Sequence, residues 1–207
     1  TKGIVSGVVS NMVTLRVDGP VLQGEICYIT TGGDRLMAEV IKVVGSDVYV
    51  QVFESTRGLK VGSQAEFTGH QLEIQLGPGM LSKNYDGLQN DLDKMDGVFL
   101  RRGQYTAPLD EDRLWDFEPI VKAGDRVQGS DWLGKVEENH QPLKIMAPFQ
   151  MEGTAVVKSI VPAGQYKVND TIAVLTTEAG EDINVTMVQH WPVKFAMTNY
   201  KEKPRPF

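Results

Sequence analysis

The chain has 207 residues, including 21 Gly and 10 Pro, with a formal net charge of −6 and a pI near 5.1. This acidic balance argues against a protein that binds nucleic acid, because such proteins need a basic surface for the phosphates. No apolar run approaches the roughly 20 residues that span a bilayer, and the N-terminal residues lack the pattern of a secretory signal. We therefore expect a soluble protein without a nucleic-acid partner or direct membrane insertion.

Residues 1–67 read as a series of short strands. Apolar and polar residues alternate, and each alternating run stops at a turn rich in Gly or Asp, as at Asp18-Gly19-Pro20 and Thr31-Gly32-Gly33-Asp34. This period-two pattern is typical of half-buried antiparallel strands. About six such strands in fewer than 70 residues predict a small closed β-barrel. Cys27, the only cysteine, lies in an apolar run and is expected to be a small core residue.

The stretch from Leu72 to Leu92 poses a question about its function. A strand-like alternation runs into a Gly-Pro-Gly corner and then into an apolar, helix-compatible segment, where nucleotide-binding proteins often carry a phosphate loop, but no such loop follows. Proline fixes one φ angle and glycine permits a sharp reversal, so the pattern predicts a structural hinge or domain junction. The predicted junction residues are Gly77, Pro78, Gly79, Asp86 and Gly87.

Residues 110–188 contain an internal repeat. The segment Ile120–Val127 recurs 40 residues later as Ile160–Val168. A repeat of this size indicates two similar strand-turn-strand units related by a rough twofold axis, which is how a flattened barrel-sandwich is built. The predicted fold is thus mainly β, with an antiparallel barrel, a barrel-sandwich-like domain and few short helices.

Four apolar residues of this domain are candidates for an interface, because aromatic side chains are favoured anchors of protein contacts. They are Trp115, Phe117, Trp132 and Leu133. The alternative is that these side chains pack inside the barrel-sandwich, and we favour this alternative over an interface role.

Two motifs imitate known sites. Residues 129–136 match the phosphate-loop pattern G-x-x-x-x-G-K-[ST] except at the last position, where Val136 offers no hydroxyl to Mg²⁺. A β-turn is the better account. Residues 145–157 and the repeat unit after them resemble a biotinyl or lipoyl carrier domain, but the expected hairpin tip, residues 176–182, contains no lysine, and Lys144 lies at the start of the first strand. The resemblance therefore supports a barrel-sandwich fold, whereas the absence of a lysine at the hairpin tip argues against attachment of biotin or lipoate.

No self-contained active site is legible. The three histidines have no paired spacing that would place two ligands on one metal, the acidic clusters lie in predicted loops, and no nucleophile elbow occurs. We therefore predict no catalytic, nucleotide-binding or metal-binding residue and no cofactor within these 207 residues.

Several segments together carry a family resemblance. They are Phe53–Gly62, Thr68-Gly69, Leu76–Leu81, Tyr85–Gln89, Lys144–Pro148 and Gln189–Val193. In this order they closely resemble the N-terminal part of the catalytic A subunit of V-type or A-type rotary ATPases, over essentially the whole chain. One departure is Asn90-Asp91-Leu92, where the family usually shows Arg-Pro-Leu, which points to a bacterial branch.

The resemblance implies a function for the parent subunit. Such a subunit couples hydrolysis or synthesis of ATP, bound with Mg²⁺, to H⁺ or Na⁺ transport, and it works on the cytoplasmic side as a peripheral part of the membrane complex. The barrel would join B subunits in an alternating ring, and the insertion domain would contact peripheral stalk subunits. The phosphate loop would follow Phe207, so this chain alone is expected to be inactive.

The resemblance also implies four segments: a barrel (1–67), a connector (68–109), a β insertion (110–188) and a return into the nucleotide-binding domain (189–207). The alternatives are a biotinyl- or lipoyl-like carrier, a free-standing β adaptor, or a small nucleotide-binding enzyme using Gly129–Lys135.

Overall fold

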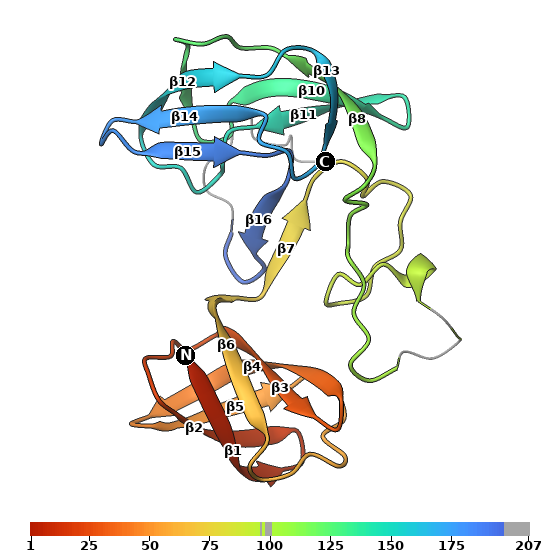
Figure 1. Cartoon of the computed structure of the whole chain (residues 1–207), viewed down its shortest axis with the longest axis vertical. Helices are drawn as coiled ribbons and strands as arrows, with labels where there is room; N and C mark the ends of the chain where they lie inside the picture. The colour runs from red at the N-terminus through yellow and green to blue at the C-terminus, as the bar shows by residue number, and fades with distance from the viewer. Residues whose placement is uncertain (96, 98–100, 197–207) are drawn as a thin grey trace. The chain divides into compact units, whose positions relative to one another are not determined.

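The computed structural model describes residues 1–95, 97 and 101–196 (Figure 1). The strands are β1 (Lys2–Val9), β2 (Met12–Val17), β3 (Glu25–Thr31), β4 (Asp34–Val44), β5 (Asp47–Val52), β6 (Gln64–Gln71), β7 (Glu73–Leu76), β8 (Leu114–Pro119), β9 (Arg126–Gln128), β10 (Trp132–Glu138), β11 (Gln141–Met146), β12 (Thr154–Ile160), β13 (Gly164–Lys167), β14 (Ala173–Thr177), β15 (Asp182–Val185) and β16 (Gln189–Pro192). Within the described residues, the one helical element is the 3₁₀ turn η1 (Leu92–Lys94). No helix in these ranges is long and apolar enough to cross a membrane. The mainly β prediction is confirmed.

The first compact unit consists of residues 1–73 together with 101–106 and 192–194. Its six strands β1 to β6 close into an antiparallel barrel in the order β1-β2-β5-β4-β3-β6 (Figure 1). Alternate residues of β2 and β5 are apolar and buried inside the barrel, as Val13 and Leu15 of β2 are, whereas β3 and β4 are buried over longer runs. The predicted closed barrel is confirmed.

The second unit contains residues 74–94 and 107–191. Two four-stranded sheets form its main part, in the orders β11-β10-β8-β13 and β15-β14-β12-β9. The first repeat supplies β8 to β11 and the second supplies β12 to β15. In each repeat the second strand, β9 or β13, crosses to the sheet of the other repeat. This reciprocal exchange is the twofold relation that the internal repeat predicts.

The sheets enclose two apolar clusters. One contains Trp115 and Phe117 of β8 with Val136 of β10, and the other contains Leu133 of β10 with Leu175 of β14. Strand β10 thus supplies side chains to both clusters, because Leu133 and Val136 are three positions apart and successive side chains of a strand point to opposite faces.

The segment after the Gly-Pro-Gly corner is not helical, although its composition is compatible with a helix. Gly79 has a φ of 104°, Ser82 has 63° and Gln89 has 61°. These left-handed residues divide the segment into turns, because an α-helix needs a continuous run of negative φ angles. Before the corner, β7 pairs with β16 in a two-stranded sheet.

Cys27 lies fully inside the barrel. Burial, followed by the nearby Glu25 carboxylate, raises the pKa of its thiol from 9.0 to about 12. The contribution of this shift to the free energy of unfolding is complete below pH 9 and is lost as the pH rises towards 12, because the unfolded thiol ionises first. We expect iodoacetamide at mildly alkaline pH to leave the folded chain unmodified and to alkylate the denatured chain, as intact mass would show. Rapid alkylation of the folded chain would contradict this assignment.

Candidate functional site: the junction loop and the sandwich groove

The Gly-Pro-Gly corner belongs to the second unit and packs closely against the residues that follow β15. A Cβ added to Gly77 would lie 3.1 Å from the carbonyl oxygen of Met187 and 3.4 Å from Cα of Val188. Pro78 is buried, and Gly79 needs its positive φ for the reversal. A larger residue would therefore collide with its neighbours at position 77 and would be strained at position 79.

The buried carboxylate of Glu138 binds the backbone at the end of the corner. The backbone N–H groups of Gly79 and Leu81 both donate to Oε1 of Glu138, each over 2.9 Å. Glu138 ends β10 and is only 3% exposed. Hydrogen bonds to an ionised acceptor are stronger than neutral ones, so Glu138 is the main polar anchor of the corner. The sequence around Glu138 does not predict this contact, since Glu138 lies 59 positions after Gly79 and 57 after Leu81.

Asp86 organises the loop that follows. Its carboxylate accepts the N–H groups of Leu88 at 2.9 Å and Asn90 at 2.8 Å, and the Asn90 side-chain amide at 2.9 Å. The neighbouring Gly87 faces open space. The side chain of Gln89 connects this loop to β7. Its amide oxygen accepts the Gln75 N–H and its amide nitrogen donates to the Gln75 carbonyl, each over 2.7 Å. Asp86 thus has a structural role that the sequence predicted only in outline.

The residues that depart from the family pattern are among the most buried in this loop. Asp91 is 1% exposed, and its carboxylate lies 3.3 Å from Nζ of Lys83 and 3.7 Å from Nζ of Lys94. Burial, followed by the charges of Asp91, Glu138 and Asp93, raises the pKa of Tyr85 above its usual value. The corner and the loop after it thus form a polar network around the carboxylates of Glu138, Asp86 and Asp91, which are held by backbone donors and lysines.

The four candidate interface residues differ in accessibility. Trp115, Phe117 and Leu133 are almost fully buried, with 3%, 1% and 0% of their surface exposed. Trp132 is half-buried, and Nζ of Lys144 lies 4.4 Å from the centre of its ring. The burial of the first three supports the alternative of core packing. Trp132 alone of the four keeps an accessible side chain.

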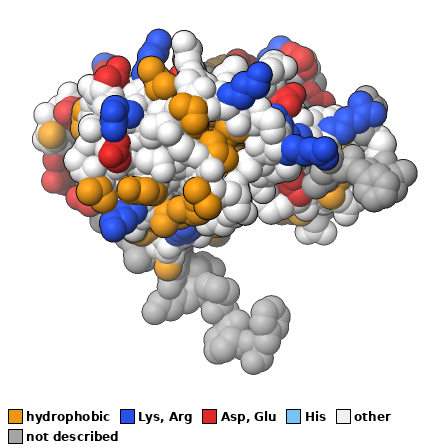
Figure 2. All heavy atoms as spheres, turned by 90° about the horizontal axis from the view of Figure 1, so that it is seen from below, with side chains coloured by type: hydrophobic (Ala, Val, Ile, Leu, Met, Phe, Trp, Pro, Cys, Tyr) orange, Lys and Arg blue, Asp and Glu red, His pale blue; other side chains and the backbone are white. Residues whose placement is uncertain are grey.

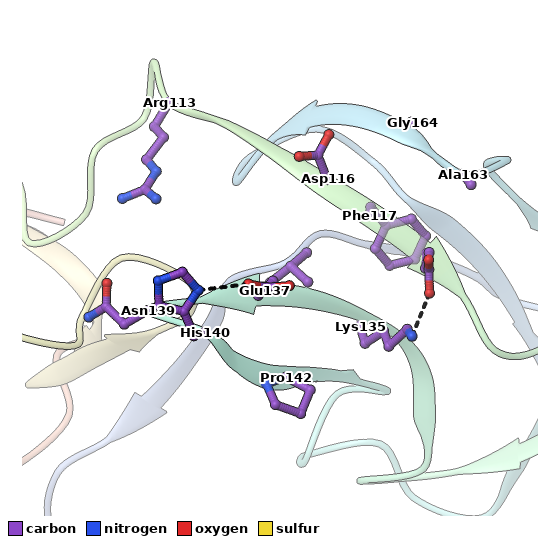
Figure 3. A pocket seen from close by; sticks show the side chains of 12 residues that line it. Arg113, Asp116, Phe117, Lys135, Glu137, Asn139, His140, Pro142, Ala163 and Gly164 are labelled. Carbon is purple, nitrogen blue, oxygen red and sulfur yellow. Dashed lines mark ion pairs between the residues drawn. The ribbon is translucent and has the colours of Figure 1, made fainter.

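The segment that imitates a phosphate loop is a turn followed by a strand. Asp131 closes the turn: its carboxylate accepts the Gln128 N–H at 2.9 Å, and its own N–H donates to the Gln128 carbonyl at 3.1 Å. Gly134 and Lys135 lie within β10, and Lys135 forms an ion pair with Glu118 at 2.6 Å (Figure 3). A phosphate loop instead leads into a helix N-terminus whose backbone N–H groups bind the anion. The β-turn account therefore holds.

The hairpin expected at the modified lysine of a carrier joins β14 to β15. Asp182 accepts the hydroxyl of Thr176 over 2.7 Å and forms an ion pair with Lys158 on β12. Lys144 lies within β11, not at a hairpin tip. The hairpin thus offers no amine for a carrier cofactor, and the carrier alternative is not favoured.

A groove of about 780 Å³ opens on the barrel-sandwich (Figure 3). Its lining includes Arg113, Asp116, Glu118, Lys135, Glu137 and His140. Lys135 forms an ion pair with Glu118, and Nδ1 of His140 lies 3.4 Å from a carboxylate oxygen of Glu137. In the part of the chain that the structure describes, no three His, Cys, Asp or Glu residues are grouped to hold a metal ion. The groove is thus lined by charged side chains of both signs.

Comparison with known sequences identifies both units. Residues 5–69 match the family model described as "ATP synthase alpha/beta family, beta-barrel domain", and residues 106–194 match "ATPsynthase alpha/beta subunit barrel-sandwich domain". The V-type ATP synthase alpha chain of Borreliella burgdorferi is 44% identical over 206 residues, which cover 98% of this chain and 36% of that protein. The alpha chain of Treponema denticola is 44% identical over 209 residues, covering 100% of this chain and 36% of that protein. The corresponding protein of Borrelia hermsii is 45% identical over 205 residues, with 98% and 35% covered. The chain therefore spans little more than a third of the length of these relatives.

Proposed function

Because the chain belongs to the family of V-type ATP synthase alpha chains, we propose that it is the N-terminal part of such a catalytic subunit and serves the assembly of a rotary ATPase. The observation that carries this proposal is the match along the entire chain, which includes both β domains in the family's order. The resemblance of the individual segments in the sequence supports the same assignment.

The barrel is proposed to contact B subunits in the alternating ring. The hairpin between β4 and β5 presents apolar side chains to solvent: Ile41 and Val43 are each 38% exposed, Val44 is 50% exposed, and Tyr49 is 37% exposed. Figure 2 shows one face of the molecule on which hydrophobic side chains are gathered between charged ones. A cluster of exposed apolar residues marks an interaction surface, so this hairpin is the part of the barrel that we assign to the ring contact.

The barrel-sandwich is proposed to contact a peripheral stalk subunit. Its groove is open, lined with charged side chains, and free of the tight enclosure that small molecules need. The half-buried Trp132, stacked under Lys144, is the one member of the four candidate residues assigned to this contact. Trp115, Phe117 and Leu133 are almost fully buried, and Phe117 also lines the groove.

The five junction residues, Gly77, Pro78, Gly79, Asp86 and Gly87, are proposed to set the path of the chain between the barrel and the nucleotide domain of the parent. Mg-ATP or Mg-ADP would bind in the part of the parent that this chain does not span, and the complete complex would drive H⁺ or Na⁺ transport from the cytoplasmic face. This chain by itself is proposed to hydrolyse no ATP, to bind no cofactor or nucleic acid, and to insert nothing into the membrane.

Two measurements on the 207-residue chain test this proposal. We expect binding to the isolated B subunit of the same organism, weakened about tenfold or more by a double change of Ile41 and Val43 to Ser, since truncating an interface anchor costs at least about 1 kcal/mol. We also expect no Mg-dependent ATP hydrolysis, with or without Lys135→Ala. Saturable hydrolysis that Lys135→Ala abolishes, or equal B-subunit binding by the double variant and a Ser55→Ala control, would contradict the respective parts of the proposal.

A further inference from the structure

Strands β8 and β10 separate after a short ladder. Among the described residues they pair at two positions, and the second is Lys135 with Glu118, which also form an ion pair at 2.6 Å. Figure 3 shows the two strands diverging from this ion pair, towards Arg113 on one strand and His140 on the other. The groove of about 780 Å³ lies along this gap, with Phe117 among its lining residues.

The backbone groups of Lys135 and Glu118 point towards each other. Further along the same register, the N–H of Ile120 donates to the carbonyl of Leu133 over 2.8 Å. Hydrogen-bonded pairs alternate with non-bonded pairs in an antiparallel ladder, and the pair of Pro119, which has no N–H, lies between these two. Every second residue of β8 and β10, counted from these pairs, therefore turns its backbone groups to the other strand.

The next such pair would be Asp116 with Glu137, but the ladder ends before it. The backbone N–H and C=O groups of these two residues therefore point into the groove. On the other side of β10, Glu137 lies opposite Pro142, which has no N–H to donate, in agreement with this orientation. Among the described residues, both walls of the groove thus carry a backbone donor and an acceptor without a strand partner.

Charge explains why the ladder stops at this point. Side chains two residues apart lie on the same face of a strand, so Asp116 and Glu137 would lie directly opposite each other, and like charges so placed repel. In the described part of the chain, neither carboxylate has a lysine or arginine partner. Asp116 accepts the side-chain amide of Gln165 over 3.1 Å, and His140 lies 3.4 Å from Glu137.

We propose that the groove holds an extended segment of a peripheral stalk subunit, whose backbone pairs with Asp116 and Glu137 and whose lysine or arginine lies between their carboxylates. The occupant rests on the stalk contact proposed above for this domain, and its chemistry follows from the open ladder. Main-chain bonds to an unpaired strand give an extended peptide its affinity, and side chains give specificity. The basic groups of the lining are engaged elsewhere, since Lys135 binds Glu118 and Arg113 lies 3.9 Å from the ring centre of Trp115. A basic side chain from the partner would replace repulsion by attraction.

The test measures binding of the 207-residue chain to the peripheral stalk complex of the same organism, together with hydrogen exchange. On binding, we expect the amides of Asp116 and Glu137 to exchange about tenfold more slowly, because each gains a backbone hydrogen bond. The amide of Lys135, already bonded in the ladder, should keep its rate. The double variant Asp116→Asn and Glu137→Gln should bind the stalk about tenfold more weakly, because the partner's basic side chain loses both carboxylates.

The control is the double variant Glu178→Gln and Glu181→Gln, which removes the same charge from the exposed hairpin between β14 and β15 and should bind as the wild type. Both double variants exchange exposed carboxylates for amides of similar shape, so unchanged urea midpoints should show that the fold is kept. Stalk binding that leaves residues 116 and 137 exchanging as in the free chain would overturn this proposal and leave the stalk contact standing. Equal affinities of the two double variants would overturn it as well. If the wild type does not bind the stalk, both the stalk contact and this occupant are wrong.

Discussion

Changing Gly134 to alanine is expected to destabilise the barrel-sandwich by about 3 kcal/mol or more, beyond the usual range for overpacking of a core. The added Cβ would lie 2.3 and 2.4 Å from two ring carbons of Phe117 and 2.8 Å from the backbone oxygen of Glu118. Phe117 is 1% exposed, so its ring has no room to withdraw, and Gly134 pairs directly with Pro119 across the ladder. Urea unfolding of the whole chain, followed by tryptophan fluorescence, measures this loss.

Two comparisons make the Gly134 result specific. Gly87→Ala adds the same methyl group in open space within the same unit, and its effect should stay within about 0.5 kcal/mol. Phe117→Leu should cost less in the Gly134→Ala background than in the wild type, because the smaller side chain relieves the collision. A wild-type unfolding midpoint for Gly134→Ala would show that β10 and β8 do not approach as described.

The second large effect is expected for Glu138→Ala, with a loss of about 2–4 kcal/mol. This change leaves the N–H groups of Gly79 and Leu81 without their carboxylate acceptor, and a hydrogen bond to a charged group contributes roughly 1.5–3 kcal/mol. Hydrogen exchange should report the loss at the corner itself, with the amides of residues 79 and 81 losing protection before those of the sheets. Urea unfolding gives the overall magnitude.

The matched variant is Glu138→Gln. Both N–H groups donate to the same oxygen, Oε1, so a single amide oxygen can replace it, and the loss should be less than half that of alanine. Glu137→Ala changes the adjacent, exposed carboxylate in the same strand and should leave the corner protected. Equal losses for Glu138→Ala and Glu138→Gln would mean that the charge, or the packing of the side chain, matters more than the two hydrogen bonds.

The sequence alone was sufficient to predict the barrel and the internal twofold repeat. The alternation of Val13 and Leu15 with polar neighbours determines which face of β2 turns inward, because successive side chains of a strand point to opposite sides. The repeated Ile-Val segments at Ile120 and Ile160 likewise predict two similar strand-turn-strand units, and they precede β9 and β13 in the structure. These properties depend on neighbours within a few residues, which a sequence displays directly.

The tertiary structure decided which residues meet. Glu138 reaches a corner 59 positions earlier, and Tyr105 reaches Glu54 across 51 positions, whereas neither has a local pattern that names its partner. The same holds for Trp115, whose place in the core rather than at the surface depends on β8 lying between β10 and β13. Local alternation determines the faces of strands, but the pairing of strands distant in sequence determines which buried acceptor satisfies which donor, and only the folded chain brings them together.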